Sequence, residues 1–184
     1  MNPKNPWQTV DSKIVYQNPW IRVREDQVLR PDGKPGIYGV VEIKPSAGVV
    51  ALNSRDEIVL VGQWRYTLNK FSWEIPTGAS SPEDETILDA AKRELEEETG
   101  IRAGQWTHLG TIDNSNGVTT DVASLFLATG LTMTESHPEP TEDIMIQWFD
   151  FNEAVAMVMK GDVTESSSVA AILKADKLRN LKKI

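Results

Sequence analysis

A group of glutamates on one predicted helix constrains this chain more than any other feature. At the helical spacing of about 100° per residue, four apolar side chains gather in one arc that defines a buried side. These are Ile87, Leu88, Ala91 and Leu95. Glu94 and Glu98 fall at the edge of that arc, and Glu97 lies about one step further round. Because desolvating an ionised carboxylate costs several kcal/mol, these side chains need a bound cation or a paired group.

The flanking residues predict where this helix begins and ends. Ser81 is suited to be the N-cap, Pro82 the first helical residue, and Asp84 the partner in a pattern like a capping box. Gly100 is suited to a left-handed C-terminal cap, with apolar Ile101 after it. We therefore expect a helix that starts near Pro82 and stops before Gly100.

Residues 93–101, which read Arg-Glu-Leu-Glu-Glu-Glu-Thr-Gly-Ile, resemble the second half of the Nudix box. That motif runs Gly, five residues, Glu, seven residues, then Arg-Glu-aliphatic-any-Glu-Glu-any-Gly-aliphatic, and the chain fits every fixed position from Glu85 onward. The first half departs, because six residues separate Gly78 from Glu85. An extra loop residue costs little, so it affects the loop more than the metal site. The alternative interpretation is an exposed acidic face with Arg93 paired to Glu97.

Composition fits a compact enzyme and excludes several other classes. The 184 residues suffice for one domain with a sizeable core and a small appendage. Lys and Arg number 19 against 27 Asp and Glu, and the net charge of -8 opposes binding to duplex nucleic acid or anionic membranes. The absence of cysteine excludes disulfides, thiolate zinc sites and cysteine nucleophiles. Without a signal-peptide or membrane-span pattern, we expect a cytoplasmic protein.

The chain is predicted to divide into an N-terminal β-rich subdomain over residues 1–45 and a Nudix domain over residues 46–184. Strand-forming residues occupy Ser12 to Gln17, Trp20 to Arg30 and Ile37 to Ile43. Strands this short do not easily form a stable unit alone, so they need the main domain, a partner chain or both. Together with the habit of the family branch named below, this predicts a homodimer.

The second part of the chain alternates strands and helices. Val49 to Leu52 and Ile58 to Val61 flank a polar turn and predict a hairpin. Further strands are expected near residues 106–112, 122–128 and 144–149, and helices over 152–160 and from about 164 onward. The resemblance implies an α+β fold of the Nudix type, an α/β/α sandwich with a mixed β-sheet, and the order of elements fits it.

Further motifs resemble the ADP-ribose pyrophosphatase branch of the Nudix hydrolases, which includes enzymes acting on other nucleoside diphosphate sugars. The likeness covers nearly the whole chain from about Trp20 onward. The matched motifs are Gln63-Trp64-Arg65, Trp73 to Gly78, Ser115-Asn116-Gly117 with Asp121, Glu139 to Ile144, and Lys160 to Glu165.

The resemblance implies a site for Mg²⁺, with Mn²⁺ as a substitute. Cleaving a diphosphate requires an activated water and neutralised phosphate oxygens, and carboxylate ligands suit these hard cations. Glu94 and Glu98 are implied as the main ligands, and Glu97 as a further or water-mediated ligand. A backbone carbonyl of Thr77 or Gly78 is an additional candidate.

Two other roles are implied by the same resemblance. Arg93 would orient the carboxylate cluster, and Glu85 would stabilise the loop and helix. The general base that takes a proton from water would come from the late acidic loop, as Glu139 or Glu142. Glu142 is slightly preferred, because it lies next to the strand at Ile144 and is better anchored.

Three candidate substrate-binding residues each have a structural alternative. Arg65 is suited to clamp a phosphate or a terminal ribose, or to form a salt bridge. Glu74 is suited to contact sugar or metal, or to be buried with a backbone partner. Trp20 is suited to stack on a base, although most tryptophans lie in cores or interfaces.

Three functional interpretations follow. The first is a Mg-dependent hydrolase of nucleoside diphosphate sugars, with ADP-ribose the first substrate to consider and GDP-mannose or a broad sugar range the nearest alternative. The second is hydrolysis of nucleoside triphosphates or RNA caps, and the acidic charge disfavours RNA. The third is a ligand sensor without catalysis, although such proteins usually lose box carboxylates or carry a DNA-binding part.

Overall fold

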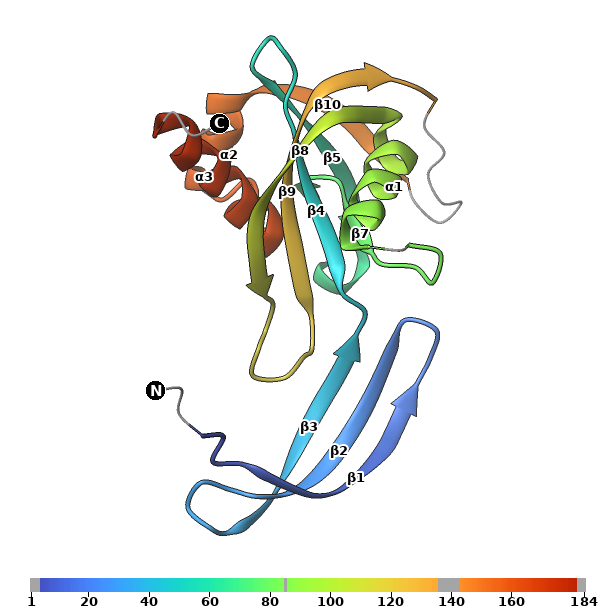
Figure 1. The fold of residues 1–184 in the computed structure, drawn as a ribbon, viewed down its shortest axis with the longest axis vertical. Coiled ribbons are helices and arrows are strands. Elements are labelled where there is room, and N and C mark those ends of the chain that lie inside the picture. Colours follow the sequence, from blue (N-terminus) through green and yellow to red (C-terminus); the bar gives the residue numbers. More distant parts are fainter. Residues whose placement is uncertain (1–3, 85, 136–142, 182–184) are drawn as a thin grey trace. The chain divides into compact units, whose positions relative to one another are not determined.

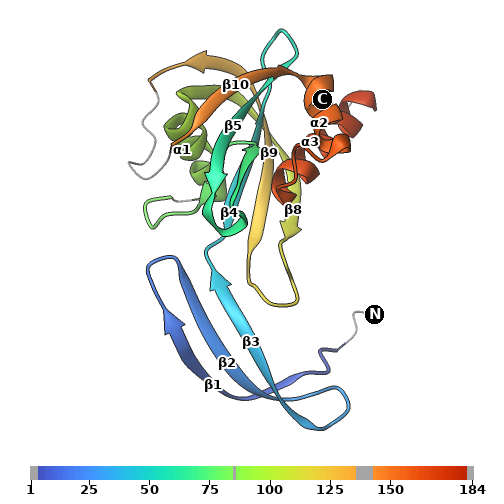
Figure 2. The ribbon, with the colours of Figure 1, turned by 180° about the vertical axis from the view of Figure 1, so that it is seen from behind.

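The computed structural model describes residues 4–84, 86–135 and 143–181. These residues form two units, which Figures 1 and 2 show as ribbons. The N-terminal unit comprises the chain up to Lys44 together with Asp113–Asp121, and the main unit comprises Pro45–Ile112 and the chain from Val122 onward. The N-terminal unit therefore includes a loop that lies far along the sequence from its strands.

The N-terminal unit is an antiparallel sheet in the order β1-β2-β3. Its strands are β1 (Gln8–Gln17), β2 (Ile21–Leu29) and β3 (Pro35–Ile43). The outer edge of β3 receives the distal loop, because the Val41 N–H donates to the Val118 carbonyl at 2.8 Å and the Thr120 N–H donates to the Val41 carbonyl at 3.0 Å. All ten residues of β1, on the opposite edge, are exposed.

Two sheets make up the centre of the main unit. The first has the order β7-β4-β9-β8 and is mixed, since β4 pairs parallel with β9 and antiparallel with β7. The second has the antiparallel order β10-β5-β6. The strands are β4 (Ser46–Ala51), β5 (Glu57–Arg65), β6 (Lys70–Glu74), β7 (Thr77–Ala79), β8 (Ile101–Asp113), β9 (Val122–Met133) and β10 (Met145–Asp150). A short 3-10 helix, Tyr66–Leu68, joins β5 to β6.

Helices cover both sides of these strands (Figures 1 and 2). Helix α1 (Ile87–Thr99) lies on one side, and α2 (Phe151–Lys160) and α3 (Ser166–Asn180) lie on the other. Each side has its own apolar core, built around Leu95 on the α1 side and around Phe151 on the other. The layers and the mixed sheet confirm the predicted fold class.

The predicted hairpin between residues 49–52 and 58–61 is wrong. A turn does join the two strands, and Leu52 and Ile58 form a single antiparallel bridge. Beyond that bridge β4 and β5 belong to different sheets. The reason is that β7 and β9 occupy both edges of β4, so β5 pairs with β6 and β10 instead.

The predicted start of α1 is also wrong. The helix begins at Ile87, and Thr86 is its N-cap, where the Thr86 hydroxyl accepts from the Asp89 N–H at 3.2 Å and the Asp89 carboxylate accepts from the Thr86 N–H at 3.2 Å. Ser81 and Asp84 instead close a turn ahead of the helix, since the Ser81 N–H donates to the Asp84 carboxylate at 2.6 Å. The predicted end is confirmed, because Gly100 caps the helix at φ 65°.

None of the helices in the described ranges combines the length and apolar character needed to span a bilayer.

The corrected helix start gives a stability prediction. Replacing an N-cap hydroxyl by alanine costs about 1 kcal/mol, so Thr86→Ala should lower the free energy of unfolding by that amount. Urea denaturation measures the difference. Ser81→Ala is the matched control and should cost a few tenths of that at most, because its hydroxyl makes an exposed contact to Glu83. A larger loss for the Ser81 variant would contradict this helix start.

Candidate active site

Helix α1 places its glutamates beside the short strand β7. Glu98 is 2% exposed, and its Oε2 accepts a hydrogen bond from the Thr77 N–H at 3.1 Å. The side chain of Glu94 is 13% exposed and that of Glu97 is 39% exposed. The alternative interpretation, an exposed acidic helix face, therefore holds for Glu97. It does not hold for Glu94 and Glu98, whose side chains are largely shielded from solvent.

Gly78 is where the backbone of β7 meets the Glu94 carboxylate. A Cβ added to Gly78 would lie 2.1 Å from the Cδ of Glu94, closer than any real contact. The absence of a side chain at Gly78 therefore lets this carboxylate lie against the strand. Because Glu98 bonds to Thr77 on the same strand, the structure brings together four of the predicted metal ligands, Glu94, Glu98, Thr77 and Gly78.

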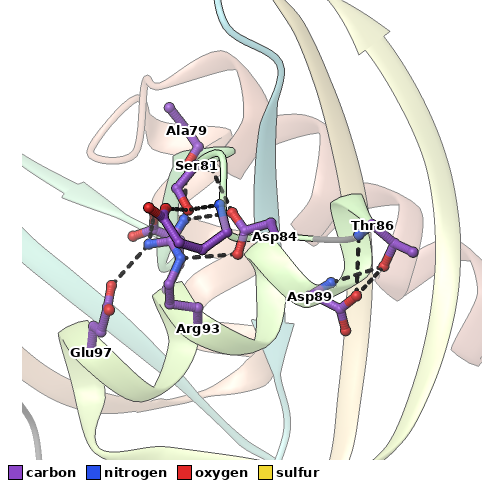
Figure 3. A network of polar contacts seen from close by, with 9 residues as sticks. Ala79, Ser81, Asp84, Thr86, Asp89, Arg93 and Glu97 are labelled. Atoms are coloured by element: carbon purple, nitrogen blue, oxygen red, sulfur yellow. Dashed lines mark hydrogen bonds and ion pairs between the residues drawn. The ribbon is translucent and has the colours of Figure 1, made fainter.

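Arg93 connects the carboxylates of α1 to the loop before the helix (Figure 3). Its Nη1 donates to Glu94 at 2.8 Å and to Glu97 at 2.9 Å. Its Nε and Nη2 donate to the two carboxylate oxygens of Asp84 at 3.1 and 3.0 Å, and Nη2 also donates to the Ala79 carbonyl at 2.9 Å. Arg93 thus makes the i, i+4 pair expected on a surface helix, and in addition fixes the loop.

Asp84 pairs with Arg93 and is not part of the helix cap that the sequence predicts. The hydrogen bond from Arg93 holds the pKa of Asp84 below its usual value of 3.8, and the same bond raises the pKa of Arg93. The Asp84 side chain is 6% exposed. No fixed position of the box lies at Asp84, so the motif carried no signal for this pair.

The donors around β7 fit a hard divalent cation. Glu94 and Glu98 supply carboxylate oxygens, and the backbone of Thr77 and Gly78 lies against them. Within the described parts of the chain, no three acidic or histidine side chains converge closely enough to form a ready cage. Three sequence-predicted residues, Glu85, Glu139 and Glu142, lie outside the described residues.

Arg65 and Glu74 form an ion pair close enough to Glu98 to be affected by its charge. Glu74 is 1% exposed, and both of its carboxylate oxygens accept from the Arg65 guanidinium, one of them from Nε at 2.8 Å. The pKa of Arg65 is raised, first by this hydrogen bond and further by the charges of Glu98 and Glu165. The salt-bridge alternative for Arg65 is thus present, and both side chains also line a pocket with Ser72, Thr164 and Glu165.

Trp20 belongs to the N-terminal unit. It is 75% exposed and lines a shallow pocket with Arg22, Glu42 and Lys44. Ser115-Asn116-Gly117 lies in the same unit, within the loop that pairs with β3, where the Tyr38 hydroxyl donates to the Gly117 carbonyl at 2.8 Å. The sequence motifs at these positions therefore belong to one unit, and the box glutamates belong to the other.

Comparison with known families agrees with the box. Residues 42–170 match the family model for the NUDIX domain, and residues 7–41 match that for the nucleoside diphosphate sugar hydrolase N-terminal domain. The chain belongs to the Nudix family. It is a Nudix pyrophosphohydrolase, as the retained glutamates of its box also indicate.

Relatives with similar sequences include an ADP-ribose pyrophosphatase of Mycobacterium tuberculosis, 30% identical over 92% of this chain and 83% of that protein. A methanol dehydrogenase activator of Bacillus methanolicus is 27% identical over 90% of both chains. Among solved structures, a crystal structure of an ADP compounds hydrolase matches with a TM-score of 0.86 at 16% identity, covering 100% of both chains. At that identity the solved structure supports the fold alone.

The contact at Gly78 gives a second prediction. Gly78→Ala should displace the Glu94 carboxylate, because its Cβ would collide with Cδ. Glu94 is a predicted metal ligand, and misplacing a group that acts in the reaction by about 1 Å can cost about 100-fold in turnover. Steady-state hydrolysis by the purified variant measures this. Gly104→Ala is the control, since its nearest neighbour would be the Gly130 carbonyl at 3.6 Å, and it should keep its turnover within about twofold. Unchanged turnover in the Gly78 variant would contradict the contact.

The Asp84–Arg93 pair gives a pH prediction. A depressed folded-state pKa stabilises the fold fully above the unfolded value of 3.8, and that contribution is lost as pH falls through the folded value. Asp84→Asn should therefore cost about 2 kcal/mol at pH 7, as for a hydrogen bond to a charged group. The difference from the unsubstituted protein should stay constant down to about pH 5 and shrink below pH 4. Urea unfolding at pH 7, 5 and 3 checks this, and a difference that does not shrink at pH 3 would contradict the assigned pair.

Proposed function

We propose that this enzyme hydrolyses the pyrophosphate bond of nucleoside diphosphate sugars in a Mg²⁺-dependent reaction, with ADP-ribose as its first substrate. Water adds to one phosphorus, the bridging P–O bond breaks, and AMP and ribose 5-phosphate leave. The observation that carries the proposal is the contact of Glu94 and Glu98 with the backbone of Thr77 and Gly78. The M. tuberculosis relative named as an ADP-ribose pyrophosphatase supports the choice of substrate.

The residues of α1 and β7 would hold the cation. Glu94 and Glu98 serve as its main ligands, with Glu97 as a further or water-mediated ligand and a carbonyl of Thr77 or Gly78 as an additional one. When bound, Mg²⁺ neutralises phosphate charge and lowers the pKa of a coordinated water. Arg93 is itself held by Asp84 and forms ion pairs with the carboxylates of Glu94 and Glu97. It therefore orients these ligands without binding the cation itself.

The proton of the attacking water goes to a glutamate of the late acidic loop in this proposal. Glu139 and Glu142 are the candidates, and we prefer Glu142 because it is the nearer of the two in sequence to β10 (Met145–Asp150). A positioned general base contributes typically about 10²-fold to 10⁴-fold to the rate.

Substrate recognition is proposed for Arg65, Glu74 and Trp20. Arg65 is oriented by the buried Glu74 carboxylate, so its position does not depend on the ligand. A guanidinium oriented in this way is suited to a phosphate or to a ribose hydroxyl. The exposed ring of Trp20 is suited to stacking on a base.

A panel of substrates tests the proposed activity. With Mg²⁺, the purified protein should release AMP and ribose 5-phosphate from ADP-ribose, and chelation with EDTA should abolish the release. GDP-mannose, dinucleoside polyphosphates and nucleoside triphosphates are assayed in parallel, and preferred cleavage of GDP-mannose would favour the nearest alternative. If the protein releases sugar phosphate from none of the nucleotide sugars, the proposal is refuted.

The same assay identifies the base. Glu142→Gln should lower kcat at least about 100-fold with KM little changed. Glu139→Gln is tested in parallel, and a larger loss there would assign the base to Glu139. Glu135→Gln, an exposed position just before the loop, should keep the kcat of the unsubstituted enzyme within about twofold.

We also propose that the enzyme is a homodimer formed through its N-terminal unit. Five apolar side chains of this sheet are at least half exposed: Val10, Ile14, Val15, Tyr16 and Ile37. Large exposed apolar patches mark interaction sites, and the outer edge of β1 offers backbone groups to a second chain.

Light scattering at micromolar concentration should give twice the chain mass of 20.5 kDa. Ile14→Lys combined with Val15→Lys should shift the mass toward that of one chain, because charged side chains on an edge strand oppose pairing. Glu135→Lys, at an exposed position of the main unit, makes the same change of two positive charges and should keep the double mass. A single-chain mass for the unsubstituted protein would contradict the dimer.

A further inference from the structure

A hydroxyl on α3 reaches the backbone that leads into β7. Ser168 is fully buried, and its Oγ accepts a hydrogen bond from the Ile75 N–H at 3.0 Å and donates one to the Glu165 carboxylate at 2.7 Å. The same carboxylate caps α3 by accepting from the N–H groups of Ser167 and Ser168 at 2.8 and 2.6 Å. Ser168 thus joins a helix cap to the segment that precedes Thr77.

The next two residues of that segment are held as well. The Pro76 carbonyl accepts from the Val49 N–H at 2.9 Å, and the Thr77 N–H donates to Glu98 at 3.1 Å. Proline fixes its own φ near -65°, and the residue before it is restricted to extended backbone. The Ile75 N–H and both polar groups of the Pro76–Thr77 peptide are thus bonded, so the backbone that leads up to the Thr77 carbonyl has little remaining freedom.

Neither Ser168 nor Glu165 belongs to the box or to α1. They lie on the helix layer on the other side of the strands from the metal-binding glutamates (Figures 1 and 2). The charge of Glu165 also acts on Arg65, with which it lines one pocket. The first turn of α3 is therefore bonded to the segment that leads into the proposed metal site, and its N-cap carboxylate lines a pocket with the proposed phosphate-binding arginine.

We propose that Ser168 is a positioning residue, which sets the place of the Thr77 carbonyl at the metal site; this inference rests on the proposed function. Replacing Ser168 by alanine leaves the buried Ile75 N–H without its acceptor. A buried unbonded donor is costly, so the segment should shift to satisfy it. The shift moves the Thr77 carbonyl relative to Glu94 and Glu98, while those side chains themselves remain.

The test is a Mn²⁺ titration followed by electron paramagnetic resonance, together with steady-state kinetics. Ser168→Ala should weaken Mn²⁺ binding about tenfold, the lower end of the range for residues that orient metal ligands. We also expect kcat for ADP-ribose to fall by a larger factor than KM changes. Metal affinity is measured without substrate, so it reports on the site independently of turnover.

Leu109→Ala controls for a simple loss of stability. Leu109 is buried on β8, at the opposite edge of its sheet from β7. It belongs to the same apolar core as Ile75, so its removal loosens that core but leaves the hydrogen bonds of the Ile75 segment in place. Both variants are titrated well below their melting temperatures, and Leu109→Ala should bind Mn²⁺ within about twofold of the unsubstituted protein.

Three outcomes overturn the inference in distinguishable ways. Equal Mn²⁺ affinity in Ser168→Ala and the unsubstituted protein removes the role of Ser168 and leaves the proposed function intact. Equal losses in Ser168→Ala and Leu109→Ala reduce that role to general stability. An unsubstituted protein that binds no Mn²⁺ refutes the metal site itself, and with it the proposed function.

Discussion

The structure depends on how two carboxylates are kept beside the core of the main unit. Glu98 is buried and Glu94 nearly so, and desolvating either charge alone would cost several kcal/mol. The fold offsets that cost with a backbone N–H for Glu98 and a guanidinium for Glu94. These contacts in turn dictate a glycine at position 78 and place β7 against α1. The arrangement of the candidate site thus follows from the need to pair the buried carboxylates with hydrogen-bond donors, and the same arrangement is the one that suits the proposed chemistry.

How far the sequence predicts this arrangement depends on the type of signal. The glutamates, Arg93 and the Gly100 cap follow from a fixed register and from local backbone rules, and both transfer directly to the structure. The α/β/α layers follow from the order of apolar strands and helices. Strand partners do not, because β4 pairs with β9, more than 70 residues away, and that choice is made by the whole sheet.

The loop before α1 shows where local rules compete. Ser81, Pro82 and Asp84 satisfy the statistics of a helix start, but Thr86 and Asp89 satisfy them too and form the capping box. Arg93 decides between them, because its bidentate contact with Asp84 needs that carboxylate in a turn nine residues earlier. A contact between residues nine positions apart produces no periodic pattern in the sequence. The hydrogen bond between Ser168 and Ile75, which are 93 residues apart, produces none either.

The loop of Asp113–Asp121 has a consequence for how the chain can be divided. Because this loop hydrogen-bonds to β3, the polypeptide passes from one unit to the other three times, after residues 44, 112 and 121. Removing the first 44 residues would strip a hairpin tip of its backbone partners, and expressing those residues alone would leave the edge of β3 bare. Neither fragment would keep all of its backbone hydrogen-bond partners. We therefore expect the two units to be inherited, engineered and unfolded together, as one polypeptide.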